Sequence, residues 1–286
     1  VQAIADLHLI SLELAPYRYP DPMEQRTENF EELSKKWMKK VGDIKSRFPE
    51  NDDGSAAIRS NADFVSAEVY ATAGDLKKAK QILRSIPTTY PNQHAAASKA
   101  LSYLVRIELA EGDITNATST TLELAKLFPE EYTAINSAAI DLAAAVSSND
   151  PQAIHKLSNI IEQSNNVATI TSYSRKRIAE VLKSAGKTEA ANSEYRTLLK
   201  EPGAPPHIYL AVAKELIKTE ESQGKFSLVE TVFGDLRESL KTAGRDYQAR
   251  ASELESEFHV RRGRVRPAEA KREKYAQKIY RCGRSN

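Results

Sequence analysis

The side chains best suited to acid–base, nucleophilic or metal chemistry are few and far apart in this sequence. The five histidines are His8, His94, His155, His207 and His259. The one cysteine, Cys282, can form neither an internal disulfide nor a cysteine-based zinc site. His94 and His207 follow prolines near expected helix starts, and His259 precedes an expected turn. We therefore interpret the histidines as structural or incidental.

The sequence also lacks the short motifs that mark common active sites. It has no phosphate-binding loop, dinucleotide-binding glycine motif, HExxH motif, EF-hand loop or GxSxG motif. Carboxylates are plentiful, as in ELESEF at 253–258, but a charged run on a helix is usually a solvated face. We expect no catalytic residue, no cofactor and no metal, and hence no enzyme. One alternative is the helical-repeat part of a larger multidomain enzyme whose catalytic part precedes Val1.

The composition favours helices and leaves the compartment open. Apolar residues make up 41% and charged residues 28% of the 286 residues, with only 11 glycines and 12 prolines. The net charge of +2 identifies no class of partner. No run of about 18 apolar residues occurs, so we expect no transmembrane segment. Asp6, His8 and Glu13 interrupt the first apolar segment, so we do not expect this segment to be a signal peptide. Cytosolic and extracytoplasmic locations fit equally well.

A glycine recurs along the chain at nearly constant spacing. Gly74, Gly112, Gly186, Gly224 and Gly263 are separated by 38, 74, 38 and 39 residues, and Asn149 stands where the long gap lacks a glycine. Asparagine tolerates the left-handed backbone that a helix end often needs. The residue five positions later is always apolar: Ala79, Ala117, Ile154, Ala191, Val229 and Ala268. We expect this residue to let two antiparallel helices approach closely beyond a tight turn.

Each period predicts two helices, one before and one after the turn. Apolar residues are spaced helically on both sides, for instance from Phe64 to Ala73 before a turn and from Ile114 to Leu127 after one. Asp150 and Pro151 are typical of a helix start, and Pro91, Pro129 and Pro202 of helix ends.

Residues 1–54 predict an irregular helical unit ahead of the repeats. We expect a helix over 1–15, a non-helical segment over 16–22 with three prolines, and a loop over 49–55. Between them, residues 23–48 predict a long helix with an apolar stripe that includes Trp37, which we therefore place in the core.

The repeat resembles the tetratricopeptide family. That family has a glycine at the turn, a small residue five positions later and a proline after the second helix, as Gly74, Ala79 and Pro91 have here. The longer period and the missing first-helix tryptophan leave related helical repeats as an alternative. We expect an all-α, right-handed α-solenoid of about six helix-turn-helix repeats. The repeats would cover 55–258, and a basic helix over 259–286 would complete or cap them.

The resemblance implies a partner-binding groove. In the family, the first helices line the concave side and meet ligands 13, 10 and 6 residues before the turn glycine. These positions hold Asn61, Phe64, Glu68, Lys99, Ser102, Arg106, Asn136, Ala139, Ala143, Tyr173, Lys176, Glu180, Ala211, Lys214 and Lys218. Of these, we take Asn61, Lys99, Arg106, Asn136, Tyr173, Lys176 and Lys214 as candidate binding residues. They suit an extended acidic peptide or a carboxylate, which would make the protein a scaffold or adaptor within a larger assembly.

The C-terminal stretch 259–286 is strongly basic, with ten lysines and arginines against two glutamates. The candidate electrostatic residues are Arg261, Arg262, Arg264, Arg266, Lys271 and Arg272. Three interpretations stay open: a soluble cap or docking on the acidic body of its own array, a contact with an acidic protein, and binding of nucleic acid or an anionic membrane.

Overall fold

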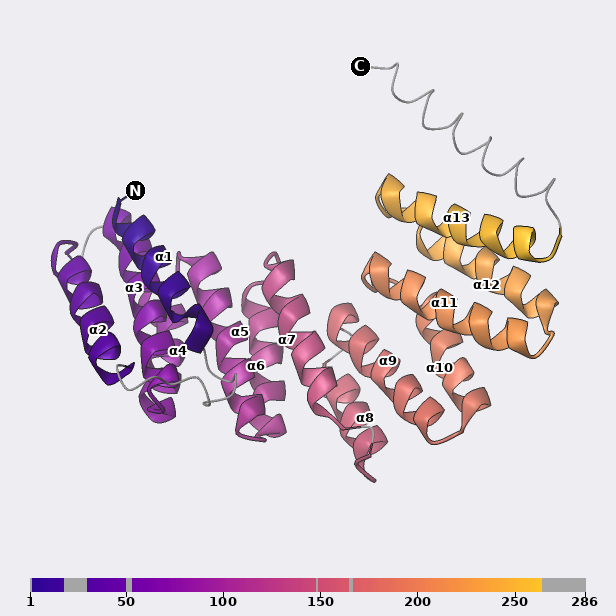
Figure 1. The fold of residues 1–286 in the computed structure, drawn as a ribbon, viewed down its shortest axis with the longest axis horizontal. Coiled ribbons are helices and arrows are strands. Elements are labelled where there is room, and N and C mark those ends of the chain that lie inside the picture. The colour runs from indigo at the N-terminus through magenta and orange to yellow at the C-terminus, as the bar shows by residue number, and fades with distance from the viewer. Residues whose placement is uncertain (1, 18–29, 50–52, 148, 165–166, 264–286) are drawn as a thin grey trace, which may run out of the picture. The chain divides into compact units, whose positions relative to one another are not determined.

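The computed structural model describes residues 2–17, 30–49, 53–147, 149–164 and 167–263. Helix makes up 82% of this described part of the chain, which contains no strand. The all-α helical-repeat class expected from the sequence is therefore confirmed (Figure 1). The chain divides into two compact units, Val1–Ala145 (unit 1) and Val146–Asn286 (unit 2).

Unit 1 consists of two helices packed on the start of a regular array. Its elements are α1 (Gln2–Leu14), the 3₁₀ turn η1 (Ala15–Tyr17), α2 (Phe30–Ser46), α3 (Asp53–Thr72), α4 (Leu76–Thr89), α5 (His94–Ala110), α6 (Ile114–Leu127) and α7 (Tyr132–Ala145). Helix α3 pairs with α4 and α5 pairs with α6, while α3, α5 and α7 lie side by side. Helices α1 and α2 both pack against α3.

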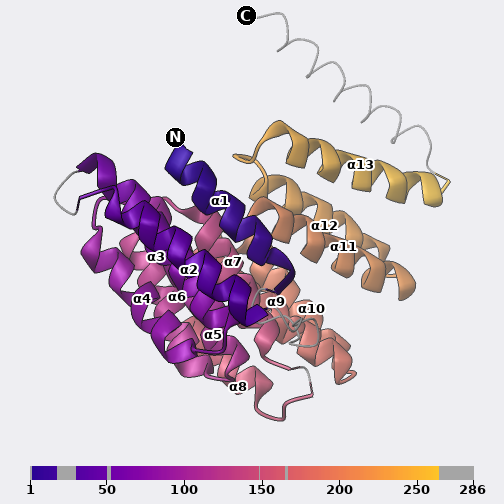
Figure 2. The same cartoon turned by 60° about the vertical axis from the view of Figure 1, so that its left-hand side comes forward.

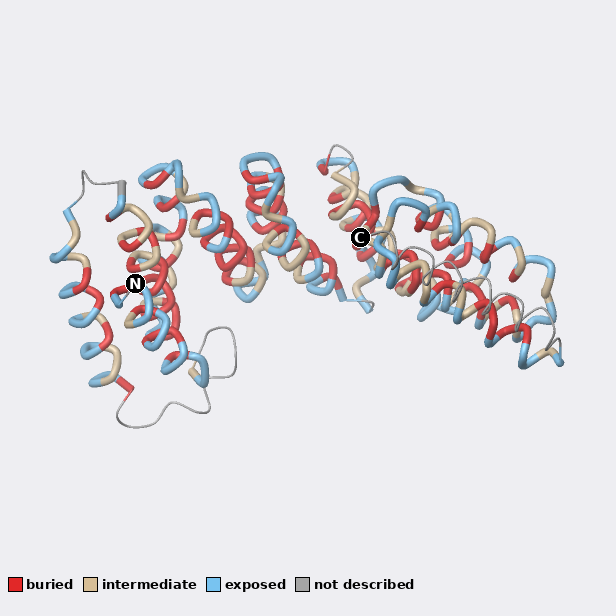
Figure 3. The backbone as a smooth tube through the Cα atoms, turned by 90° about the horizontal axis from the view of Figure 1, so that it is seen from above, coloured by how far each residue is buried: buried red, intermediate tan, exposed pale blue. Residues whose placement is uncertain are grey.

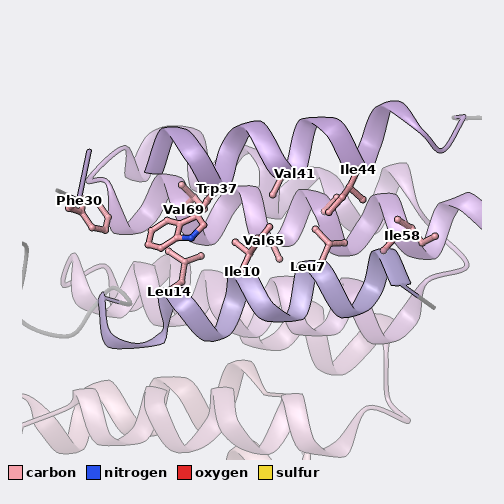
Figure 4. Packing of buried hydrophobic residues seen from close by; sticks show 12 residues of the cluster. Leu7, Ile10, Leu14, Phe30, Trp37, Val41, Ile44, Ile58, Val65 and Val69 are labelled. Carbon is pink, nitrogen blue, oxygen red and sulfur yellow. The ribbon is translucent and has the colours of Figure 1, made fainter. Parts of the chain in front are cut away.

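The N-terminal helices share one apolar core with α3. Leu7 and Ile10 of α1, Val41 of α2 and Val65 of α3 are all buried in it (Figure 4). Trp37 is buried there as expected, and its Nε1 donates a hydrogen bond of 2.7 Å to Glu13 Oε2. Burial of this apolar surface holds residues that precede the repeats onto the first repeat.

Two boundaries in this region differ from the sequence prediction, and a third is not tested. Pro16 and Tyr17 lie in the 3₁₀ turn η1 rather than in a non-helical segment, because proline is tolerated in the first turn of a helix. Helix α3 already includes Gly54 and Ser55, which we had placed in a loop. Helix α2 begins at Phe30, and residues 18–29 lie outside the described residues.

Unit 2 contains α8 (Ala153–Gln163), α9 (Ala168–Ser184), α10 (Thr188–Lys200), α11 (Pro206–Ser222), α12 (Phe226–Ser239) and α13 (Arg245–Arg261). Helix α9 pairs with α10 and α11 with α12, while α13 packs against both α11 and α12 (Figures 1 and 2). Buried residues follow the faces that neighbouring helices share, and exposed residues gather at the turns (Figure 3). The second helix expected for the last repeat lies beyond the described residues.

The recurring glycine ends the first helix of each regular hairpin in a left-handed conformation. Gly112 has φ +77°, and its N–H donates to Leu109 O at 3.0 Å. The next N–H, of Asp113, reaches back to Glu108 O at 2.9 Å, which completes a Schellman motif. Asp113 is also the N-cap of α6, because its carboxylate accepts from Asn116 N at 3.1 Å. The expected turn is confirmed, and the other four repeat glycines also have positive φ.

The position five residues after the glycine is buried in every regular hairpin. Ala79, Ala117, Ala191 and Val229 are all essentially inaccessible to solvent. The third repeat differs, because Ile154 is 38% exposed and Ala153 is buried in its place. The sequence prediction for Ile154 is therefore wrong by one residue.

The third repeat lacks the tight turn, which explains this shift. Three residues separate the paired helices elsewhere, but seven separate α7 from α8, and the boundary between the two units falls there. Asp150 and Pro151 precede α8 instead of starting it. The Asp150 carboxylate accepts from Gln152 N at 2.8 Å, and the first helical residue is Ala153. Without a left-handed glycine, the linker is not held to three residues, so the buried position of the second helix no longer lies five residues after the turn position.

One apolar position at the end of α6 was also misassigned. Leu127 is 46% exposed, and Phe128, the C-cap residue, is buried instead. The helix ends here, so the 3.6-residue period no longer predicts which side chain faces the core. No helix in the described part of the chain is long and apolar enough to span a membrane.

We expect alanine substitutions at two glycines to change stability in opposite directions. A Cβ at Gly112 would meet no atom within 4 Å, so Gly112→Ala costs about 1 kcal/mol through backbone strain alone. Gly42 lies inside α2 and also has free space, so Gly42→Ala stabilises by up to about 1 kcal/mol. Urea denaturation measures both changes. A loss of the same size for both variants contradicts the turn assignment.

Candidate functional site

A hollow of about 340 Å³ lies within unit 1, lined by residues of α3, α5 and α7 (the unit-1 hollow). Its lining includes Phe64, Glu68, Lys99, Ser102, Arg106 and Ser137. Five of these six were expected groove residues, at positions 10 or 6 before Gly74 and 13, 10 or 6 before Gly112. The repeat spacing places them together, because first helices of successive hairpins lie side by side with the same face turned the same way.

The cation of Lys99 lies over an aromatic ring in this hollow. Its Nζ is 4.1 Å from the centre of the Phe64 ring, and that ring in turn packs against Tyr103 at 5.8 Å. Phe64 itself is buried. The ring therefore supports the lysine stem and attracts its ammonium group, while Lys99 as a whole remains exposed to solvent.

Arg106 is the second cation of the unit-1 hollow, two helical turns beyond Lys99 on α5. Its Nε is 3.9 Å from Asp141 Oδ2 on α7. Burial raises the pKa of Asp141, and the Arg106 charge opposes that rise. Two acidic side chains also line the hollow: Glu131 and the buried Glu68, whose Oε2 accepts from Ser11 Oγ at 2.8 Å. The hollow thus combines two cations, two carboxylate side chains, an aromatic ring and hydroxyl groups.

The structure places the other expected groove residues elsewhere. Asn61 donates from Nδ2 to Ala57 O at 2.7 Å, and neither Asn61 nor Asn136 belongs to the lining of the hollow. In unit 2, the Tyr173 hydroxyl lies 2.6 Å from His207 Nε2, and Lys176 is paired with Glu180. Tyr173 and Lys176 are therefore engaged with residues of their own unit.

A second hollow, of about 440 Å³, lies between α11 and α13 in unit 2 (the unit-2 hollow). It is lined by Lys214, Ile217, Lys218, Glu221, Ser222, Leu254 and Arg261. Lys214 was an expected groove residue and Arg261 an expected tail residue, so the structure brings together two groups that the sequence had treated separately. Arg261 Nη2 donates to Glu221 Oε2 at 3.0 Å.

Of the six candidate electrostatic residues, the two that the structure describes both contact the helical array. Arg261 pairs with Glu221, and the Arg262 guanidinium stacks 3.7 Å from the centre of the Phe226 ring. These contacts are of the kind expected from self-docking. Arg264, Arg266, Lys271 and Arg272 lie outside the described residues.

Sequence reasoning missed buried ion pairs that join consecutive repeats. Glu108 of α5 is almost inaccessible, and its Oε1 accepts from Arg84 Nη2 of the preceding α4 at 2.7 Å. Glu220 of α11 pairs in the same way with Arg196 of α10. Both glutamates stand four residues before a turn glycine, and both arginines ten residues after the preceding one. This shared offset from the turn was the signal in the sequence.

A second missed feature is a cluster of Glu230, Glu255 and His259 on α12 and α13. We had interpreted the carboxylates of 253–258 as a solvated face, but Glu255 is buried and accepts from Arg237 Nη1 at 2.8 Å. That interpretation is wrong for Glu255, because α13 packs against α12 on the side that carries it. The i, i+4 spacing of Glu255 and His259 was the available signal.

Comparison with models of known protein families finds no match for this chain, and a search of curated proteins finds none either.

We expect Arg84→Ala to cost about 3 kcal/mol of unfolding free energy, because among the described residues it leaves the buried Glu108 carboxylate with the Thr120 hydroxyl alone as a hydrogen-bond partner. Adding Glu108→Gln should recover at least about 1 kcal/mol, since the neutral amide is less costly to bury. The matched control is Lys241→Ala in the exposed Lys241–Glu238 pair, expected to change stability by less than about 1 kcal/mol. Chemical denaturation measures the unfolding free energy of each variant. If Arg84→Ala loses no more unfolding free energy than Lys241→Ala, the prediction is wrong.

Burial lowers the pKa of His207, which should make the stability of unit 2 depend on pH. As the pH falls, His207 in the unfolded chain takes up a proton near the ordinary histidine pKa of about 6.5, whereas His207 in the folded chain does so only at a lower pH. The contribution of neutral His207 is therefore full above about pH 6.5 and is lost as the pH falls through the lowered pKa of the folded state. His207→Gln should flatten the pH dependence of unfolding free energy between about pH 5 and 7. If the unfolding free energy of His207→Gln depends on pH as steeply as that of the parent protein, the prediction is wrong.

Proposed function

We propose that the protein is a non-catalytic scaffold that binds an extended, acidic protein segment in the unit-1 hollow. The observation that carries the proposal is the joint presence of Lys99, Arg106 and the Phe64 ring in one solvent-open depression. All three come from repeat positions at which the resembled family meets its ligands.

The spacing of the two cations supports an extended ligand. Lys99 and Arg106 are seven residues apart on α5, which corresponds to about 10 Å along a helix axis. A ligand in the extended polyproline II conformation advances about 3.1 Å per residue with three residues per turn, so carboxylates three residues apart lie on one side and match that separation. A guanidinium and an ammonium group both form charge-assisted hydrogen bonds with carboxylates.

We infer that the repeats are tetratricopeptide-like, and that the hollow is used as grooves of such arrays are used. The supports are the left-handed glycine, the buried small residue five positions later and the proline after the second helix, present at Gly74, Ala79 and Pro91. Helical-repeat arrays present extended surfaces that commonly hold another chain. Binding of nucleic acid or an anionic surface through the basic tail is the alternative; the contacts of Arg261 and Arg262 with the array favour self-docking over it.

The test uses displayed peptides that carry two aspartates or glutamates at spacings from one to six residues. We expect selection of spacing three, with affinity measured by fluorescence anisotropy. The double variant Lys99→Ala/Arg106→Ala should weaken binding at least tenfold, which corresponds to about 1.4 kcal/mol. Lys176→Ala is the matched control, because Lys176 is a predicted groove lysine paired with Glu180 outside the hollow.

The double variant should also keep its unfolding midpoint, since exposed positions usually change stability by less than about 0.5 kcal/mol each. Unchanged peptide affinity in a stably folded double variant refutes the unit-1 hollow as the binding site. Selection of basic or purely apolar peptides would refute the proposal that the ligand is acidic, but not the proposal that the hollow binds a protein segment.

A further inference from the structure

We propose that unit 2 contains a binding site for a divalent transition-metal cation, formed by Glu230 of α12 with Glu255 and His259 of α13. Each of these residues offers one donor atom, and the three donor atoms lie within 4.8 Å of one another. Glu255 and His259 are one helical turn apart, so their side chains extend from the same face of α13.

The separations between donor atoms suit a shared ion better than hydrogen bonds. His259 Nδ1 is 3.8 Å from Glu230 Oε1, and His259 Nε2 is 4.0 Å from Glu255 Oε1. Both distances exceed the hydrogen-bonding range of about 3.2 Å. Two ligand atoms that each lie about 2.1 Å from one metal ion are at most about 4.2 Å apart, and His259 Nδ1 and Glu230 Oε1, the pair that an ion at Nδ1 would bridge, fall within that limit.

The imidazole of His259 is buried, but one of its ring nitrogens has no hydrogen-bond partner. The residue is only 5% exposed, and its Nδ1 is buried without a hydrogen bond. A buried polar nitrogen left without a partner destabilises the fold. The ring is packed against Phe258, with centroids 5.4 Å apart, so it is held beside the carboxylates rather than turned to solvent. A metal ion bound at Nδ1 would satisfy it.

The repeat register explains why a cation is missing at this position. His259 stands four residues before Gly263, where Glu108 and Glu220 stand before their own glycines and meet Arg84 and Arg196. The position that corresponds to those two arginines, ten residues after Gly224, is Gly234. A Cβ at Gly234 would meet nothing within 4 Å. The last interface therefore has space in place of the arginine that earlier repeats supply.

The remaining contacts define what kind of ion fits. Arg237 Nη1 lies 2.8 Å from both Glu255 oxygens, which orients the carboxylate, as partners outside the ligand shell do at metal sites. The Glu230 side chain is 41% exposed, which leaves an entry route from solvent. One imidazole and two carboxylates suit Zn²⁺ or its neighbours better than Mg²⁺. The nearby Arg237 charge opposes any cation, so we expect moderate affinity.

The test is calorimetric titration of the full chain with Zn²⁺ and, separately, Mg²⁺ at pH 7.5. All proteins carry Cys282→Ser, so that the thiol cannot contribute. We expect one equivalent of Zn²⁺ to bind and to raise the melting temperature, with no binding of Mg²⁺. His259→Ala and Glu230→Gln should each weaken Zn²⁺ binding at least tenfold. Glu230→Gln keeps the proposal testable if His259→Ala does not fold, because Glu230 is partly exposed and the amide preserves its shape.

The matched control is His94→Ala. His94 Nδ1 also faces a glutamate, Glu130 Oε1, but at 2.7 Å, as a hydrogen-bonded and exposed pair. This variant should bind Zn²⁺ like the parent protein. The proposal is overturned if the parent protein does not bind Zn²⁺. It is also overturned if Glu230→Gln and His259→Ala both bind Zn²⁺ as tightly as the parent protein does. The second result would show Zn²⁺ held only by other surface residues.

Discussion

The regular repeats depend on one backbone constraint, the left-handed glycine that ends the first helix of each hairpin. In the turn at Gly112, two reverse backbone hydrogen bonds satisfy carbonyls at the end of α5, and the next residue, Asp113, already caps α6. A helix therefore ends and another begins within three residues. Because the linker has no length to vary, any residue at a fixed distance from the glycine occupies the same place in each hairpin.

Two of these fixed places explain how the helices pack. Five residues after the glycine, a small or branched apolar residue such as Ala117 is buried, which allows the second helix to lie close to the first. Four residues before it, the side chain points toward the preceding repeat, where Glu108 and Glu220 meet arginines. A buried carboxylate is stable only with such a partner, so these pairs restrict how consecutive hairpins can stack.

The third repeat shows what happens when the constraint is absent. Asn149 replaces the glycine in the sequence, the linker between α7 and α8 grows to seven residues, and the buried position moves to Ala153. The boundary between the two units falls at the start of this linker. Each unit has its own hollow, with Lys99 and Arg106 in one and Lys214 and Arg261 in the other. The final interface departs in a different way, since His259 and Gly234 replace the glutamate and arginine of earlier repeats.

The sequence alone determined the features that depend on local geometry. Periodic apolar residues predicted the helices, glycine spacing predicted the positive-φ turns, and phase along the helix placed Trp37 in the core. It also selected Lys99 and Arg106 as neighbours on one face of α5. Only the tertiary structure decided the burial of Glu255, the exposure of Ile154 and the engagement of Tyr173 with His207. Each of these depends on which side chain a neighbouring helix presents, and that is set by stacking between segments distant along the chain rather than by local periodicity.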